Sequence, residues 1–171
     1  MEPGQNRKIA ALTFNFYVHI FFGVIMKEKY INLALEEAKI AFELNEVPVG
    51  AVIVKDNRVI SKAHNLKWCT NSIMNHAEIV AIMEASEYVG DWRLNECEMY
   101  VTLEPCPMCA GAILQARIKK VYIGSKSNVK SNTDVINRIL QNSEYNHMVD
   151  VEYLENKDCS QILSDFFVNK R

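Results

Sequence analysis

The sequence lacks an excess of positive charge and an even set of cysteines. Nineteen Lys and Arg stand against 21 Asp and Glu, for a net charge of −2, which argues against a basic coat for nucleic acid but leaves room for a local basic patch. The cysteine count of five suits free thiols in a reducing compartment better than a disulfide framework. The chain also lacks internal repeats and low-complexity segments. The 171 residues therefore predict one cytoplasmic domain with a real core.

The first 25 residues lack a clear targeting signal. The stretch from Ile9 to Met26 is almost continuously apolar, and two basic residues precede it, which resembles a weak signal peptide or a marginal membrane span. No small-x-small cleavage site precedes Met26, and an amphipathic helix follows at once. We expect residues 1–25 to be a peripheral leader, which would lie outside the native protein if the start codon is at Met26. Residues 26–171 would form the functional domain. We expect no membrane partner. Export or membrane attachment is the alternative.

Two short segments carry the chemistry: His76-Ala77-Glu78 and the Pro-Cys-x-x-Cys run from Pro105 to Cys109. Together they supply one imidazole, two thiols and a carboxylate that is not needed as a ligand. Catalytic zinc typically takes three protein ligands and leaves a fourth position for water. The pair of segments also resembles the H-x-E…P-C-x-x-C signature of zinc deaminases. We therefore predict one Zn²⁺ per subunit, bound by His76, Cys106 and Cys109, with Glu78 moving protons.

The spacing places these residues at helix starts. Pro107 suits the first position of a helix, where its missing N–H costs nothing. Cys106 and Cys109 then lie at i and i+3, on one side of the first turn, where the positive helix end favours thiolates. A second helix, beginning at His76, would carry Glu78 in its first turn. Two helix starts facing one another would form the metal site.

Each residue also has a structural interpretation. Asn75 and Glu78 match a helix-capping pair. Cys106 and Cys109 alone would equally suit a redox pair or a structural zinc site. No structural role links the two segments, so their combination favours catalysis. A non-catalytic zinc-binding module would need a fourth protein ligand, and the candidates are His64, Cys69 and Cys97.

Hydrophobic periodicity and turn residues place the secondary structure. We expect helices over residues 27–45, 76–85, 106–115, 132–142 and 158–169, and strands over residues 49–55, 58–65, 98–103, 121–123 and 148–153. Because strands alternate with helices, the chain predicts an α/β fold whose central sheet is covered on both faces.

Several segments resemble the tRNA-specific adenosine deaminases of the cytidine deaminase-like superfamily. They are Glu46–Val52, His64-Asn65, His76–Ile79, Trp92–Leu94, Tyr100–Cys106, Met108–Ala112, Asn146-His147 and Ser164–Phe167. The resemblance covers Met26 to Arg171. The zinc motif identifies the superfamily, and the Glu-Val-Pro-Val-Gly and Asp-Phe-Phe segments favour the tRNA branch.

This resemblance implies a three-layer α/β/α sandwich with a central, mostly five-stranded mixed sheet, and a homodimer. It implies hydrolysis of adenosine to inosine at the wobble position, with the tRNA anticodon loop as partner. Asn65 matches the family's base-contacting asparagine, Val47 and Pro48 match its pocket wall, and Ala77 falls among the substrate contacts.

The resemblance is weakest after Gly124. The run Ser125–Asp134 lacks the family's glycines, and Ser127 stands where the family has a loop aspartate. Pro107 is a form seen in free-base deaminases of the superfamily. The alternative function is therefore deamination of a free nucleobase or nucleoside of guanine, cytosine or adenosine type. A riboflavin-pathway deaminase is disfavoured, since no reductase domain follows.

Overall fold

The computed structural model describes residues 3–129 and 132–168 of the chain. It divides into two units, Met1–Tyr30 and Ile31–Arg171. Helix α1 (Pro3–Glu43) begins in the first unit and ends in the second. The expected helix start at Lys27 is wrong, because no proline after Pro3 interrupts this apolar stretch and the helix simply continues. Within the part of the chain described, no helix offers a stretch long and apolar enough to cross a membrane.

The second unit contains a five-stranded mixed sheet, which confirms the predicted α/β fold. Its strands are β1 (Gly50–Lys55), β2 (Arg58–His64), β3 (Glu98–Leu103), β4 (Lys120–Ser125) and β5 (Asp150–Tyr153). The spatial order is β2-β1-β3-β4-β5. Strand β1 runs antiparallel to both of its neighbours, whereas β3, β4 and β5 are parallel to one another.

The helices of this unit follow the strands in alternation. They are α2 (Ala77–Val89), α3 (Pro107–Gln115), α4 (Asn132–Leu140) and α5 (Lys157–Val168), together with the part of α1 after residue 30. All the predicted elements are present, although α2 continues four residues past its expected end. Asn169, the expected last helical residue, lies outside the described residues.

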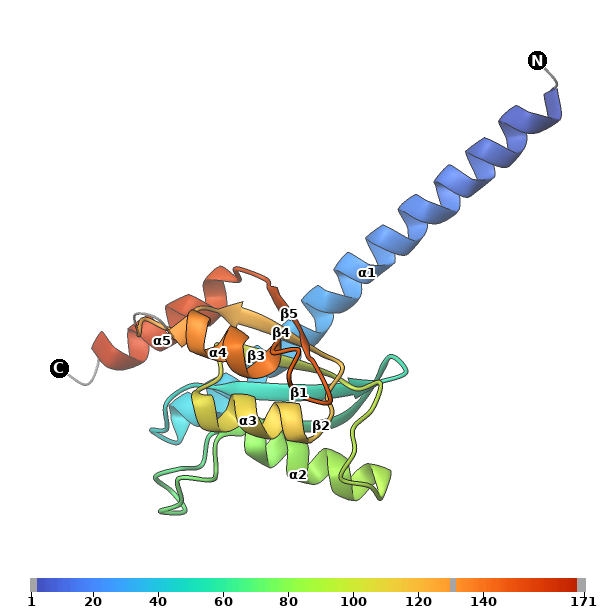
Figure 1. Ribbon diagram of the computed structural model, residues 1–171. Helices are drawn as coiled ribbons and strands as arrows, with labels where there is room; N and C mark the ends of the chain where they lie inside the picture. Colours follow the sequence, from blue (N-terminus) through green and yellow to red (C-terminus); the bar gives the residue numbers. More distant parts are fainter. Residues whose placement is uncertain (1–2, 130–131, 169–171) are drawn as a thin grey trace. The chain divides into compact units, whose positions relative to one another are not determined.

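Side chains alternate between the two faces of the sheet and so define three layers. Ala51 and Ile53 belong to one apolar core with Ala81 of α2 and Ile113 of α3. The opposite face meets α1 and α5: a Cβ added to Gly50 would lie 2.0 Å from the Ala34 carbonyl oxygen. On the same face, a Cβ on Gly124 would lie 2.7 Å from Cys159 Sγ. Figure 1 shows α2 and α3 on one side of the sheet and α5 on the other.

The start of β1 and the ends of β2 and β3 lie side by side at one end of the sheet. Because β1 is antiparallel to β2 and β3, the start of β1 lies beside the ends of both neighbours. Gly50 opens β1 opposite His64, and its N–H donates to Thr102 Oγ1 at 3.1 Å. The residues just before β1, just after β2 and just after β3 therefore converge. These are the segments that contain Val47, Asn65 and Cys106.

Candidate metal centre and active site

The proposed ligands occupy the N-terminal caps of two helices. His76 is the N-cap of α2 and Cys106 is the N-cap of α3, both with extended backbone angles. Neither side chain caps its own helix, so both are free to serve the site. Pro107 opens α3 as expected. The capping role considered for Asn75 is wrong: its side-chain amide donates to Thr70 Oγ1 at 2.8 Å instead.

The three predicted ligands lie at the spacing of a tetrahedral zinc site. Cys106 Sγ lies 3.6 Å from Cys109 Sγ and 3.7 Å from His76 Nδ1, and Cys109 Sγ lies 3.5 Å from the same nitrogen. With zinc–sulfur bonds of about 2.3 Å and a zinc–nitrogen bond of about 2.0 Å, a tetrahedron separates two sulfurs by about 3.8 Å and sulfur from nitrogen by about 3.5 Å. The donor set and its spacing thus fit zinc.

The candidate fourth ligands lie outside this group. Among the residues described, one group of three could hold a metal ion: His76, Cys106 and Cys109, whose ligand atoms all lie within 4.8 Å of one another. The Nδ1 atom of His64 lies 2.8 Å from Glu37 Oε2. Cys69 is exposed in a loop, and Cys97 is buried beside the start of β3, at the far end from Cys106. A closed, four-residue structural site therefore gains no support.

The thiols and the imidazole polarise one another. The neighbouring Cys109 sulfur lowers the pKa of Cys106 to about 4, and the His76 ring adds to this effect. Interaction with Cys106 in turn raises the pKa of His76. The same neighbour, together with burial, raises the pKa of Cys109. In the metal-free protein one thiolate is therefore already present, which is the form that binds metal.

Glu78 is a buried carboxyl beside the ligands. It is 3% exposed, and burial is the main reason why its pKa is raised above the ordinary value for glutamate. It stands in the first turn of α2, two residues after His76. A carboxyl whose pKa is shifted toward neutrality suits a group that must accept and then release a proton.

A cavity of about 190 Å³ opens at these residues. It is lined by Glu46, Val47, Val49, Asn65, Lys67, His76, Glu78, Leu103, Glu104 and Cys106. Two of the predicted substrate contacts, Val47 and Asn65, are thus beside the predicted proton shuttle. Pro48 and Ala77 are buried next to lining residues but do not line the cavity themselves.

Asn65 connects two segments of the cavity wall. Its Oδ1 accepts the Ala77 backbone N–H at 2.9 Å, and its Nδ2 donates to the Val47 carbonyl at 2.9 Å. The first bond satisfies a backbone donor at the start of α2, which has no partner within the helix. The asparagine therefore ties the segment before β1 to the helix that carries Glu78.

Sequence reasoning missed two buried carboxylates in this wall. Glu46 is 1% exposed, and its Oε1 accepts the backbone N–H groups of Trp68 at 2.6 Å and Cys69 at 2.7 Å. Glu104 is 4% exposed and accepts four hydrogen bonds. A glutamate that follows a strand carries no spacing signal of its own. Both glutamates lie in segments that resemble the tRNA-specific adenosine deaminases, and this resemblance was the one signal that could have indicated them.

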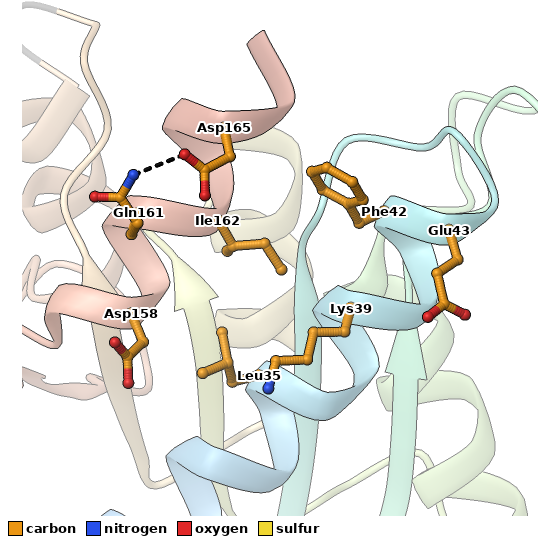
Figure 2. Close-up of a pocket in the computed structure, with 8 residues that line it drawn as sticks. All are labelled: Leu35, Lys39, Phe42, Glu43, Asp158, Gln161, Ile162 and Asp165. Carbon is orange, nitrogen blue, oxygen red and sulfur yellow. Dashed lines mark hydrogen bonds between the residues drawn. The ribbon is translucent and has the colours of Figure 1, made fainter. Parts of the chain in front are cut away.

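A larger groove lies away from these residues. It has a volume of about 570 Å³ and runs between α1 and α5, where Leu35, Phe42 and Ile162 form its apolar part. Figure 2 shows Gln161 and Asp165 on its α5 side, joined by a 2.7 Å hydrogen bond. None of its lining residues belongs to the cavity at the ligands. Size therefore does not identify the reactive site here, whereas the clustered ligand chemistry does.

Fold and site together define a deaminase. Residues 25–171 match the family model for MafB19-like deaminases. The tRNA-specific adenosine deaminase of Aquifex aeolicus is 43% identical over 145 residues, which cover 85% of this chain and 96% of that protein. The enzyme of the same description from Bacillus subtilis is 40% identical over 141 residues, covering 82% and 88%.

A solved structure points the same way. It comes from work on A-to-I editing by tRNA:A34 deaminases at the wobble position of transfer RNA, and it superposes with a TM-score of 0.74 at 39% identity. The match covers 80% of this chain and 99% of that one. The chain therefore belongs to the tRNA-specific adenosine deaminase family, and the predicted family and fold are confirmed.

Proposed function

We propose that this protein hydrolyses adenosine to inosine at the wobble position of a tRNA anticodon. The observation that carries the chemistry is the set of His76 and two cysteines at zinc spacing, with the carboxyl of Glu78 beside it. The substrate is inferred from the relatives, which are described as tRNA-specific adenosine deaminases and are 40–43% identical over most of their length.

His76, Cys106 and Cys109 would hold the zinc ion. When bound by three protein ligands, zinc lowers the pKa of water and so supplies a nucleophile at neutral pH. Glu78 accepts the proton of the attacking water, which adds to carbon 6 of the adenine. The same carboxyl then delivers a proton to ring nitrogen N1 and assists departure of ammonia. Its burial excludes bulk solvent and keeps the proton within the site.

The wall residues would orient the base. Val47 and Asn65 line the cavity, and Asn65 has its side chain held on both sides. Pro48 and Ala77 are the other two proposed substrate contacts, and both are buried beside residues that line the cavity. A wobble base suits such a cavity because a loop nucleotide can be splayed out without breaking a duplex.

The assembly and setting of the protein form further parts of the proposal. We infer a homodimer in the cytoplasm, with residues 26–171 as the zinc-dependent deaminase domain and residues 1–25 as a peripheral leader. The relatives, described as tRNA-specific adenosine deaminases, support the cytoplasmic setting, and the family model, which begins at residue 25, supports the domain boundary. The homodimer is inferred from the family resemblance. Analytical ultracentrifugation at micromolar concentration would test for the dimer. Mass spectrometry of the natural N-terminus would identify the first residue of the protein.

The deciding experiment uses an anticodon stem-loop with adenosine at the wobble position. Purified protein loaded with one zinc per chain should convert this adenosine to inosine, and a stem-loop with guanosine there serves as the matched control. Free guanine, cytosine and adenosine are offered in parallel. Turnover of a free base or nucleoside without conversion of the stem-loop would replace the tRNA assignment with the small-molecule alternative.

A further inference from the structure

Glu104 collects hydrogen bonds from three separate parts of the chain. Its Oε2 accepts the Ser127 backbone N–H at 3.2 Å and the Asn132 side-chain amide at 2.8 Å. Its Oε1 accepts the hydroxyls of Thr133 and Tyr153, each at 2.7 Å. Both oxygens of this buried carboxylate are thus fully engaged with the segment after β4, the start of α4 and the last strand.

The residue stands between two hollows. One is the cavity at the metal ligands, and the other is an open hollow of about 460 Å³ beside it. The second is lined by Leu103, Glu104, Cys106, Pro107, Ser127, Val129, Asn132 and Val135. Leu103, Glu104 and Cys106 line both. We call residues 126–129 and 132–135 the wall segment, since they form the far side of this open hollow.

The described residues of the wall segment make further contacts near the cavity, and one of them places Lys126 Nζ over the Tyr153 ring, 5.1 Å from its centre. Asn132 also reaches the Pro105 carbonyl at 3.3 Å, and the Ser127 hydroxyl binds within the segment, to Val129 N–H at 3.2 Å. Val129 is 68% exposed, so apolar burial contributes little there. Three hydrogen bonds to Glu104 and the bond from Asn132 to Pro105 therefore join the wall segment to the strand end, which leads two residues after Glu104 to the ligand Cys106.

The contacts exclude a direct chemical role for Glu104. It is not part of the group of potential metal ligands, and its oxygens are occupied by four donors. The proton shuttle is supplied by Glu78, which lies in the first turn of α2 beside His76. A group that touches neither metal nor reacting atoms, yet shapes the wall, acts through position.

We propose that Glu104 is a positioning residue that holds the wall segment in the conformation that receives the RNA substrate. This inference rests on the proposed function, because it assumes that the hollow beside the cavity meets nucleic acid. A wall that is already ordered costs less conformational entropy on binding than one that must be ordered by the substrate. Loss of Glu104 therefore weakens substrate binding and leaves the zinc chemistry intact.

The test is a graded series of variants. Tyr153→Phe removes one of the four bonds, Glu104→Gln retains one acceptor oxygen, and Glu104→Ala removes all four. Glu152→Gln is the matched control, since this neighbouring carboxylate pairs with Lys120 on the sheet. Each protein is assayed for zinc content, for amide hydrogen exchange at Ser127 by NMR, and for KM and kcat on the anticodon stem-loop.

The expected effects rise along the series. KM should increase about twofold, fivefold and tenfold, as expected when a few net hydrogen bonds are lost, with kcat changed by less than about twofold. Ser127 exchange should accelerate in the same order, with one zinc per chain throughout and no change in the control. A fall in kcat at constant KM, or unaltered Ser127 exchange in Glu104→Ala, overturns the proposal.

The readouts separate this proposal from the function on which it rests. If the wild-type protein did not act on the stem-loop, the proposed function would fail, whereas exchange at Ser127 would still show whether Glu104 holds the wall segment. If Glu104→Ala did not fold, Tyr153→Phe and Glu104→Gln would still have to show the ordered increase. Equal KM values for these two variants and the wild type would then refute the positioning role.

Discussion

The floor and the rim of the cavity are built in different ways. By the floor we mean His76, Glu78, Cys106 and Cys109, which stand at the starts of α2 and α3. By the rim we mean the loop over residues 66–75, whose Lys67 lines the cavity, and the wall segment, which lines the adjoining hollow. Each part of the rim donates hydrogen bonds to one buried carboxylate, Glu46 or Glu104. The proposed chemistry is thus placed at helix starts, whereas the proposed recognition is placed on a loop and on a segment that leads into α4, both tied down by a carboxylate. Changes to the floor should alter kcat, and also the metal content where a ligand is replaced, whereas changes to the rim should alter KM.

The largest effect is expected at the floor, from Glu78→Gln. Loss of the proton shuttle should lower kcat by about 10³- to 10⁴-fold, the upper range for general acid–base catalysis. Zinc content should stay at one per chain, because Glu78 is not among the ligand group. The measurement is single-turnover inosine formation together with metal analysis. A variant that kept its activity would remove Glu78 from the mechanism.

Thiol reactivity should divide the cysteines by their pKa. After zinc removal, Cys106, with a pKa of about 4, is a thiolate throughout the range from pH 6 to 8, so its alkylation rate should stay flat. Cys69, whose pKa is raised by desolvation and by Glu46, is protonated in this range, so its rate should rise about 100-fold, tenfold per pH unit.

A further thiol, Cys159, serves as a reference in that experiment. Burial raises the pKa of Cys159 to about 12, so it should remain protonated and unreactive at pH 8. Zinc should protect Cys106 and Cys109 but leave Cys69 accessible. Peptide mapping of the labelled sites reports each rate. Equal labelling of Cys106 in the zinc-loaded and zinc-free proteins would contradict the ligand assignment.

Asn65 lies between floor and rim, so its variants should show mixed effects. Asn65→Ala leaves the Ala77 N–H without its partner and should lower kcat/KM about 30-fold. Asn65→Asp keeps that acceptor but replaces the donor to Val47 with an oxygen and adds a negative charge, so a loss of about fivefold should remain. Steady-state kinetics on the stem-loop decide this. Equal losses in both variants would show that the bond to Ala77 is not what matters.

At the rim, Glu46→Ala should raise KM about fivefold, because the backbone donors of Trp68 and Cys69 lose their acceptor and the loop loosens. Glu46→Gln retains one acceptor oxygen and should raise KM about twofold. In both variants kcat should be unchanged. A lower kcat with an unchanged KM would show that Glu46 acts like the floor residues, and it would contradict the proposed difference between floor and rim.

The smallest effect is expected from the leader. A chain that starts at Met26 should keep kcat/KM within about twofold of the full chain, since all the residues placed in the site lie in the second unit. The comparison uses the two purified proteins at equal zinc content. An inactive or insoluble shorter chain would assign the first 25 residues a part in the function.

The floor could be predicted from the sequence, and most of the rim could not. His-x-Glu and Pro-Cys-x-x-Cys have short fixed spacings that suit the first turn of a helix, so the sequence alone places His76, Cys106 and Cys109 at helix starts. Glu104 contacts residues 23 to 49 positions away, and no local pattern encodes such contacts. The strands were predictable from their β-branched runs. The N-terminal extension of α1 was not, because an apolar leader carries no periodic signal of its own.

The last strand has a consequence for how the enzyme matures. The three metal ligands and Glu78 all lie within the first 109 residues, whereas Tyr153, which completes the shell around Glu104, follows them in the chain and belongs to the last strand. The nascent chain therefore contains every residue of the floor before it contains the hydroxyl that closes the shell around Glu104. All four hydrogen bonds to this carboxylate can form only once β5 has paired with β4.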